Sequence, residues 1–79
     1  MTMKRSYEAT QIGKDHPAYI DGIKIIEIHA WNEKDEHWLF YIAPKAEDDI
    51  FNILEMIDSF EDEVLDMLTL IWTKATLPQ

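Results

Sequence analysis

The chain has 79 residues, a length that supports one domain with a single small core. It is 47% hydrophobic, which excludes a disordered acidic tail, and it contains no cysteine, which excludes a disulfide scaffold, a thiolate zinc site and a cysteine nucleophile. Sixteen acidic residues against seven basic ones give a net charge of -9, and this balance disfavours direct binding to nucleic acid through a basic patch.

The start of the chain predicts neither a secretory signal nor a membrane anchor. Lys4 and Arg5 are followed by polar residues instead of an apolar stretch with a cleavage site. No apolar run approaches the roughly 20 residues that a membrane span requires. We therefore expect a cytoplasmic protein that does not bind membranes.

The chain is expected to form one domain over residues 1–79, in which residues 17–43 are a β meander. Ala18–Ile20 is predicted as a short strand, because Asp21 and Gly22 after it have the chemistry of a tight two-residue turn. Residues 1–16 alternate only weakly, and they are read as a flexible segment or a short edge strand.

A hairpin is expected in the second half of this meander. Residues 23–31 are rich in β-branched and aromatic side chains, which is typical of a strand, although the adjacent Ile25 and Ile26 interrupt the alternation. That interruption indicates either a bulge or a strand that is covered on both faces. A polar stretch at 32–36 then precedes a second aromatic and apolar run at 37–42.

After Pro44 the hydrophobic period changes to that of a helix, and residues 44–76 are predicted to be helical. Pro44 suits a first helical turn, and the acidic residues that follow it suit the positive end of the helix dipole. Ser59, followed by Asp62 and Glu63, could start a second helix, so both one long helix and two helices of about a dozen residues are considered. The expected fold class is α+β, a small antiparallel sheet of two to three strands followed by one long or two shorter C-terminal helices.

Charge in the helical segment is one-sided. Nine of the 16 acidic residues lie between Ala46 and Thr73, and none of the seven basic residues does. A helix selected only for solubility usually mixes signs, because like charges on one face repel each other. On a continuous helix, five of these side chains would form an acidic ridge opposite the apolar stripe. They are Asp48, Glu55, Asp58, Asp62 and Asp66.

Such a ridge predicts binding to a basic surface of another protein. Proteins that bind nucleic acid carry such surfaces, so the partner is expected to be a nucleic-acid-binding host protein, for which the ridge would be a decoy. At the level of class, the chain is similar to the small acidic inhibitors carried by phages and mobile elements, including DNA mimics and anti-CRISPR proteins. The similarity rests on size, charge and the lack of a catalytic motif.

An alternative function is a homodimeric structural or immunity-type module that acts through the apolar surface of the helix. Leu65 and Trp72 lie off the main apolar stripe and are predicted to meet a second copy or a target protein. The alternative is that the segment breaks at Ser59 and the preceding helix covers them. Trp31 is the third residue predicted at such an interface.

Catalysis and metal binding are not expected. His29 and His37 would lie near opposite ends of the hairpin loop, with Glu27, Asp35 or Glu36 close enough to complete a metal or acid–base site. Their spacing, however, is not that of a helical zinc site. With two glycines the chain has no glycine-rich phosphate loop, and its acidic clusters lack the alternating ligands of an EF-hand. We therefore predict no enzyme activity, no catalytic residue, no metal and no cofactor.

Overall fold

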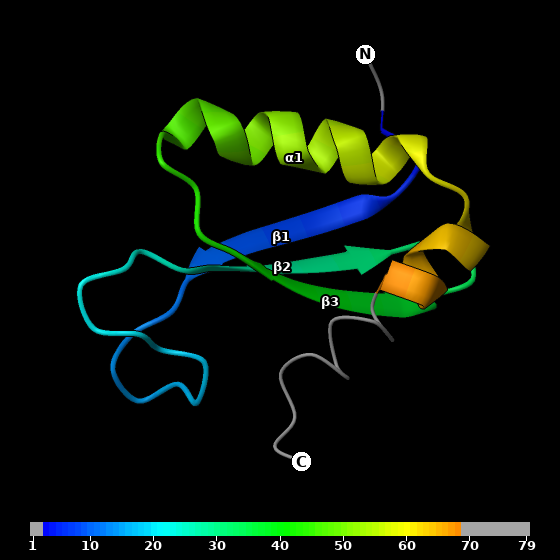
Figure 1. The fold of residues 1–79 in the computed structure, drawn as a ribbon. Coiled ribbons are helices and arrows are strands. Elements are labelled where there is room, and N and C mark those ends of the chain that lie inside the picture. The colour runs from blue at the N-terminus through cyan, green and yellow to red at the C-terminus, as the bar shows by residue number, and fades with distance from the viewer. Residues whose placement is uncertain (1–2, 69–79) are drawn as a thin grey trace.

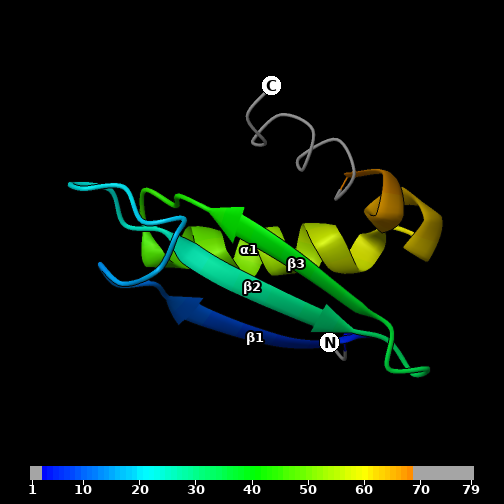
Figure 2. The same ribbon diagram turned by 90° about the horizontal axis from the view of Figure 1, so that it is seen from below.

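The computed structural model describes residues 3–68 of the chain. Three antiparallel strands, β1 (Ser6–Gln11), β2 (Ile26–Trp31) and β3 (His37–Ile42), form one sheet in the order β1-β2-β3. Helix α1 (Glu47–Ser59) crosses one face of this sheet, and a shorter helical segment at 62–68 lies beside the start of β3 (Figures 1 and 2). The predicted α+β fold is confirmed, in the form with two helices.

The alternation of β2 determines which face of the sheet carries the core. Ile26, Ile28 and Ala30 are buried, whereas the residues between them are half-buried on the opposite face. The register is continuous from Gln11↔Ile26 to Ser6↔Trp31 and across to β3, so no bulge interrupts β2. Ile25, which interrupts the alternation in the sequence, lies just before the strand. Its carbonyl accepts a hydrogen bond from Ile12 N–H at 3.1 Å.

The hairpin between β2 and β3 is confirmed. Asn32 stabilises its loop, because its side-chain oxygen accepts hydrogen bonds from the backbone N–H groups of Lys34 and Glu36 at 3.0 and 2.9 Å. Asp35 adopts the left-handed conformation, with φ of 62°, that closes the loop.

The strand predicted at Ala18–Ile20 is wrong. Gly22 does form a turn, with φ of 82° and a hydrogen bond from Ile23 N–H to the Ile20 carbonyl, but the turn lies in a loop. Ile20 and Ile23 are about half exposed, so they contribute little to a core. The edge of β2 is occupied instead by β1, which lies in the segment 1–16 that the sequence predicts to be flexible or a short edge strand.

Helix α1 begins at Glu47, so Pro44 lies in the connection before it and not in its first turn. Its first three residues are acidic, as expected, and the Asp49 carboxylate accepts a hydrogen bond from Ala46 N–H at 3.1 Å. The helix ends at Ser59, whose hydroxyl donates to the Met56 carbonyl at 2.6 Å. Phe60 then takes an extended conformation, which separates α1 from the segment at 62–68.

Arg5 joins the N-terminal end of β1 to the end of α1. Its side chain is 2% exposed, and its guanidinium donates to the carbonyls of Ile57 and Phe60 at 3.1 and 2.6 Å. It also forms an ion pair with Asp62 at 2.7 Å and lies 5.5 Å from the centre of the Trp38 ring. One cation therefore binds carbonyls at the C-terminus of α1 and the Asp62 carboxylate at the start of the next segment.

The core lies between α1, the sheet and the segment at 62–68. One cluster of its buried side chains contains Ala30, Trp38, Ile57 and Leu65, which come from β2, β3, α1 and the segment at 62–68. Leu65 is fully buried, so the segment that follows Phe60 is an integral part of the core.

We predict that Arg5→Ala destabilises the protein by about 3–5 kcal/mol, because it removes the donor of the Phe60 carbonyl, a second donor of the Ile57 carbonyl and the cation paired with Asp62. Urea unfolding followed by tryptophan fluorescence measures this change. The matched control is Lys4→Ala, at an exposed neighbouring position, which should change stability by no more than about 0.5 kcal/mol. Equal effects of the two substitutions would contradict the role assigned to Arg5.

Candidate functional site

The acidic residues predicted to form one ridge do not lie on one continuous helix face. The chain turns at Phe60, between Asp58 and Asp62, so a single helical face from Asp48 to Asp66 does not exist. Three of the five carboxylates bind other parts of the chain, as described below. The geometry predicted for the ridge is therefore wrong, and the binding role of these residues stays a prediction.

Asp58 fastens the end of α1 to the start of β1. Its carboxylate accepts hydrogen bonds from Lys4 N–H at 2.9 Å, Arg5 N–H at 3.1 Å and the Tyr7 hydroxyl at 2.8 Å. Burial alone would raise the pKa of Asp58, but these hydrogen bonds outweigh it and hold that pKa below its usual value. Burial, reinforced by the bond to Asp58, raises the pKa of Tyr7 to about 12, so this phenol remains a donor.

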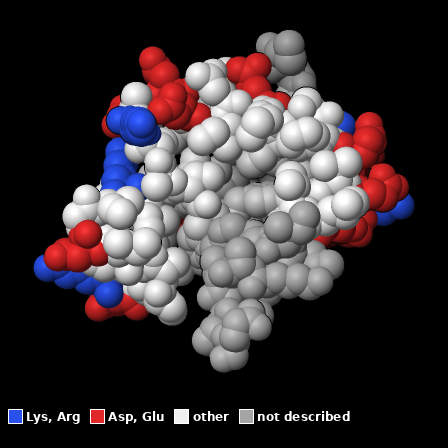
Figure 3. Space-filling view, in the orientation of Figure 1, with Lys and Arg blue, Asp and Glu red and all other residues white. Residues whose placement is uncertain are grey.

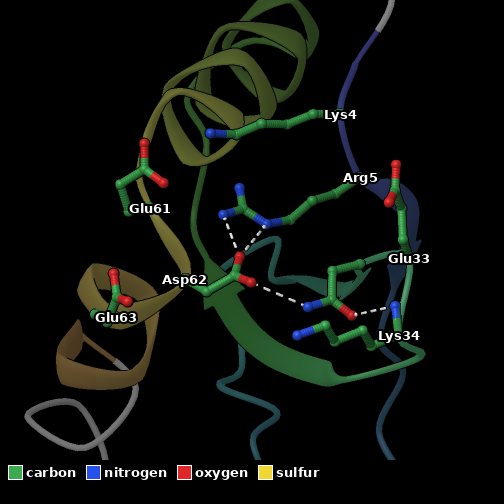
Figure 4. Close-up of a pocket in the computed structure, with 8 residues that line it drawn as sticks. Lys4, Arg5, Glu33, Lys34, Glu61, Asp62 and Glu63 are labelled. Carbon is green, nitrogen blue, oxygen red and sulfur yellow. Dashed lines mark hydrogen bonds and ion pairs between the residues drawn. The ribbon is translucent and has the colours of Figure 1, made fainter.

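Asp62 occupies the corner where three distant segments meet (Figure 4). Besides binding Arg5 it accepts a hydrogen bond from the Asn32 amide at 3.0 Å, which ties in the hairpin loop. The bond from Arg5 is the main reason that the pKa of Asp62 lies below its usual value. A hollow of about 340 Å³ opens at this corner, lined by charges of both signs from the N-terminal segment, the hairpin loop and residues 61–63.

Asp66 also has a partner within the chain. Its carboxylate accepts a hydrogen bond from the Trp38 indole N–H at 2.7 Å, which joins the segment at 62–68 to β3. Asp58, Asp62 and Asp66 thus each satisfy a donor that the fold would otherwise leave unpaired, and their first role is structural.

Asp48 and Glu55 remain as exposed carboxylates of α1. They lie on its outward side with Asn52 and Ser59, all four exposed, and we call these residues the outward acidic face. Within residues 3–68 neither carboxylate has an ion pair or hydrogen bond, whereas the neighbouring Glu47 pairs with Lys24 at 3.9 Å. Figure 3 shows acidic side chains over α1 and at the side of the hairpin, with uncharged side chains between them where described residues are drawn.

Two large apolar residues at the margins of this face were missed by the sequence reasoning. Phe51 is 59% exposed and Met56 is 52% exposed. The sequence could have predicted their exposure, because both fall outside the spacing of the apolar stripe that contains Ile53 and Ile57. On a helical projection they lie on opposite sides of the outward acidic face.

The residues predicted at an apolar interface have different fates. Leu65 is buried in the core, and its assignment to an interface is wrong because the turn at Phe60 directs it inward. Trp31 is half-buried on the sheet face opposite α1. Trp72 lies outside the described residues.

The sheet face opposite α1 carries a hydrogen-bonded histidine cluster. His29 and His37 do face each other across the hairpin, with Nδ1 and Nε2 2.7 Å apart. Their ring centres are 4.9 Å apart and their planes differ by 9°, so the two imidazoles are nearly parallel. The Trp31 ring lies nearly parallel to both.

Glu27 is the acceptor at the centre of this cluster. It accepts hydrogen bonds from Nε2 of His16 at 2.8 Å, Nε2 of His29 at 2.7 Å and the Tyr41 hydroxyl at 2.9 Å. The bond from His29 is the main reason that the pKa of Glu27 lies below its usual value. Because His16 Nδ1 accepts from Ala18 N–H at 3.0 Å, His16 has its proton on Nε2.

These contacts satisfy both nitrogens of His16 and His29 within the chain. Among residues 3–68, no group of three or more His, Asp or Glu side chains has the geometry of a metal site. The cluster connects the loop before β2 to both strands of the hairpin, and we assign it this connecting role.

No helix within the described part of the chain is both long and apolar enough to cross a bilayer. Comparison with known proteins finds no matching family model, curated protein or solved structure.

We predict that Leu65→Ala costs about 2–5 kcal/mol of stability, because it opens a cavity in the core. Met67→Ala is the control in the same segment, at a position that is 62% exposed, and should cost no more than about 0.5 kcal/mol. Urea unfolding of both variants measures the difference. Equal stability of the Leu65→Ala and Met67→Ala variants would contradict the burial of Leu65 in the core.

We also predict that the protein loses stability in acid through Asp58 and Asp62. Since their folded pKa values lie below the unfolded value of about 4, the ionised carboxylates stabilise the fold above that pH, and the gain disappears as pH falls through the folded values. Asp58→Asn should lower stability at neutral pH by about 1–3 kcal/mol and reduce its loss in acid. Unfolding at a series of pH values tests this, with Glu55→Gln as a control that removes a charge but no hydrogen bond.

Proposed function

We propose that this protein is a non-catalytic acidic binding protein, which docks the outward acidic face of α1 on a basic surface of another protein. The observation that carries the proposal is that Asp48 and Glu55 are exposed and, among the described residues, without an ion-pair partner, on a helix with no basic residue. Seven residues separate them, which places them about 10 Å apart along a rigid element. Free carboxylates held this way attract a basic partner without first breaking bonds inside the chain.

We propose further that the partner surface is the nucleic-acid-binding site of a host protein. A protein that neutralises phosphates presents clustered Lys and Arg side chains, and these are the groups that Asp48 and Glu55 would pair with. By occupying that site the protein acts as an inhibitor, in the manner of the small acidic inhibitors of phages and mobile elements that it resembles in size and charge. Such a partner places the protein in the cytoplasm.

In this proposal the other three acidic residues act indirectly. Asp58, Asp62 and Asp66 hold α1 and the following segment against the sheet, and so keep the outward face in position. Substituting them should weaken binding only as far as it unfolds the protein.

We predict that replacing Asp48 and Glu55 together by Lys abolishes capture of a basic protein from a host-cell lysate. The control replaces Asp15 and Glu33, which are exposed and lie outside α1, by Lys; it changes the net charge equally and should retain capture. Captured proteins are identified by mass spectrometry at low and high salt, because charge pairing between exposed groups weakens as salt screens it.

The captured protein is then tested for nucleic-acid binding in competition with this chain. The proposal expects the wild type and the control to displace nucleic acid, and the variant with Asp48 and Glu55 replaced to lose about tenfold or more in affinity, roughly 1.4 kcal/mol. Equal loss in both charge variants would show a nonspecific effect of net charge and refute the assigned face.

A further inference from the structure

Strand β1 leaves one edge of the sheet open. It pairs only with β2, and within the described residues no strand or helix lies along its outer side (Figure 2). All of its residues except Tyr7 are exposed, and Glu8 is its only charged residue. Natural edge strands are usually protected by Pro, Lys or a bulge, and β1 has none of the three.

An exposed aromatic ring lies beside this open edge. Phe51 precedes Asp58 by seven residues, two helical turns, so both side chains leave α1 on the same side. Asp58 contacts β1 through Tyr7 at 2.8 Å. Asp58 also contacts the chain just before β1, through the N–H groups of Lys4 and Arg5. Because α1 and β1 run in opposite directions (Figure 1), Phe51 lies about 10 Å further along, beside the middle of β1.

The part of β1 next to Phe51 is exposed to solvent. Tyr7, Ala9 and Gln11 point to the helix side of the sheet, because they alternate with the residues on the other face. Ala9 and Gln11 are exposed, so α1 does not cover this part of β1. An apolar ring, an uncovered strip of strand and unpaired backbone groups therefore lie together.

We propose that a second copy of this chain pairs with β1, antiparallel, about a two-fold axis at Ala9. The two sheets then continue into one, both copies of α1 lie on the same face, and the two Phe51 rings pack together above the paired Ala9 residues. The patch is self-complementary, as a two-fold interface requires. Glu8 of each copy lies opposite Thr10 of the other, and Tyr7 lies opposite Gln11.

This axis is selected by charge. An axis at Glu8 would place two carboxylates directly opposite each other, which destabilises a strand pair. An axis between two residues would place the helices on opposite faces and separate the Phe51 rings, because adjacent residues point to opposite sides of a strand. The axis at Ala9 avoids both.

The dimer interface and the proposed contact with a basic partner should respond to salt in opposite ways. Each copy carries a net charge of -9, so two copies repel each other and added salt should strengthen the dimer. The same salt should weaken docking on a basic partner. The dimer does not depend on the proposed function, and either can fail alone.

Sedimentation equilibrium at low and high salt, over a range of protein concentrations, tests the dimer. We expect a dimer that tightens with salt, and we expect Phe51→Asp to weaken it by about a hundredfold, roughly 2.7 kcal/mol. Met56→Asp is the matched control, since Met56 is similarly exposed but lies on the other margin of α1, and it should dimerise like the wild type. Circular dichroism and urea unfolding verify that both variants fold.

The axis is tested by cross-linking, because the chain has no cysteine of its own. Oxidised Ala9→Cys should form a covalent dimer, since only residues facing each other come close enough for a disulfide, whereas Asn52→Cys on the outward acidic face should not. A wild type that is monomeric at high salt, a dimer that survives Phe51→Asp, or equal cross-linking at both positions would overturn the proposal.

Discussion

The burial of Arg5 is the interaction on which the rest of the arrangement depends. An ionised side chain that is 2% exposed requires partners for its donors, and here they come from the end of α1 and from Asp62. This requirement sets where α1 must stop relative to β1, and it fixes the direction of the chain after Phe60. Leu65 enters the core and Asp66 reaches Trp38 because the segment at 62–68 starts from that point.

The same requirement divides the acidic residues into two groups. Asp58 accepts hydrogen bonds from backbone N–H groups of the N-terminal segment, and Asp62 pairs with Arg5. Both carboxylates are therefore already bonded within the chain. Asp48 and Glu55, on the outward side of α1, contact no basic group among the described residues and remain available to a partner. Both groups contribute equally to the net charge, but only the second group has carboxylates that a partner protein could pair with.

Much of the fold follows from local patterns in the sequence. The hairpin, the start of the helical region with its acidic first turn, and the possible break at Ser59 were all indicated by period and composition. The third strand was misplaced because Asp21 and Gly22 do form a turn, and because the choice between two segments for the edge of β2 depends on contacts distant in sequence. The burial of Leu65 and the internal pairing of three acidic residues could not be read from a helical projection, because the projection assumes that the helix continues past Phe60.

Arg5 also constrains the order in which the molecule can be assembled. Its hydrogen bonds join residues that are 52 to 57 positions apart, so the first strand cannot be secured until nearly the whole described chain exists. During synthesis the β2–β3 hairpin can form first, because its paired residues are close in sequence. The contacts of Arg5 that secure β1 can form only later, when the end of α1 and Asp62 have been made. Completion of the fold is therefore expected to be a late, cooperative event, in which β1, the end of α1 and the segment at 62–68 become ordered together.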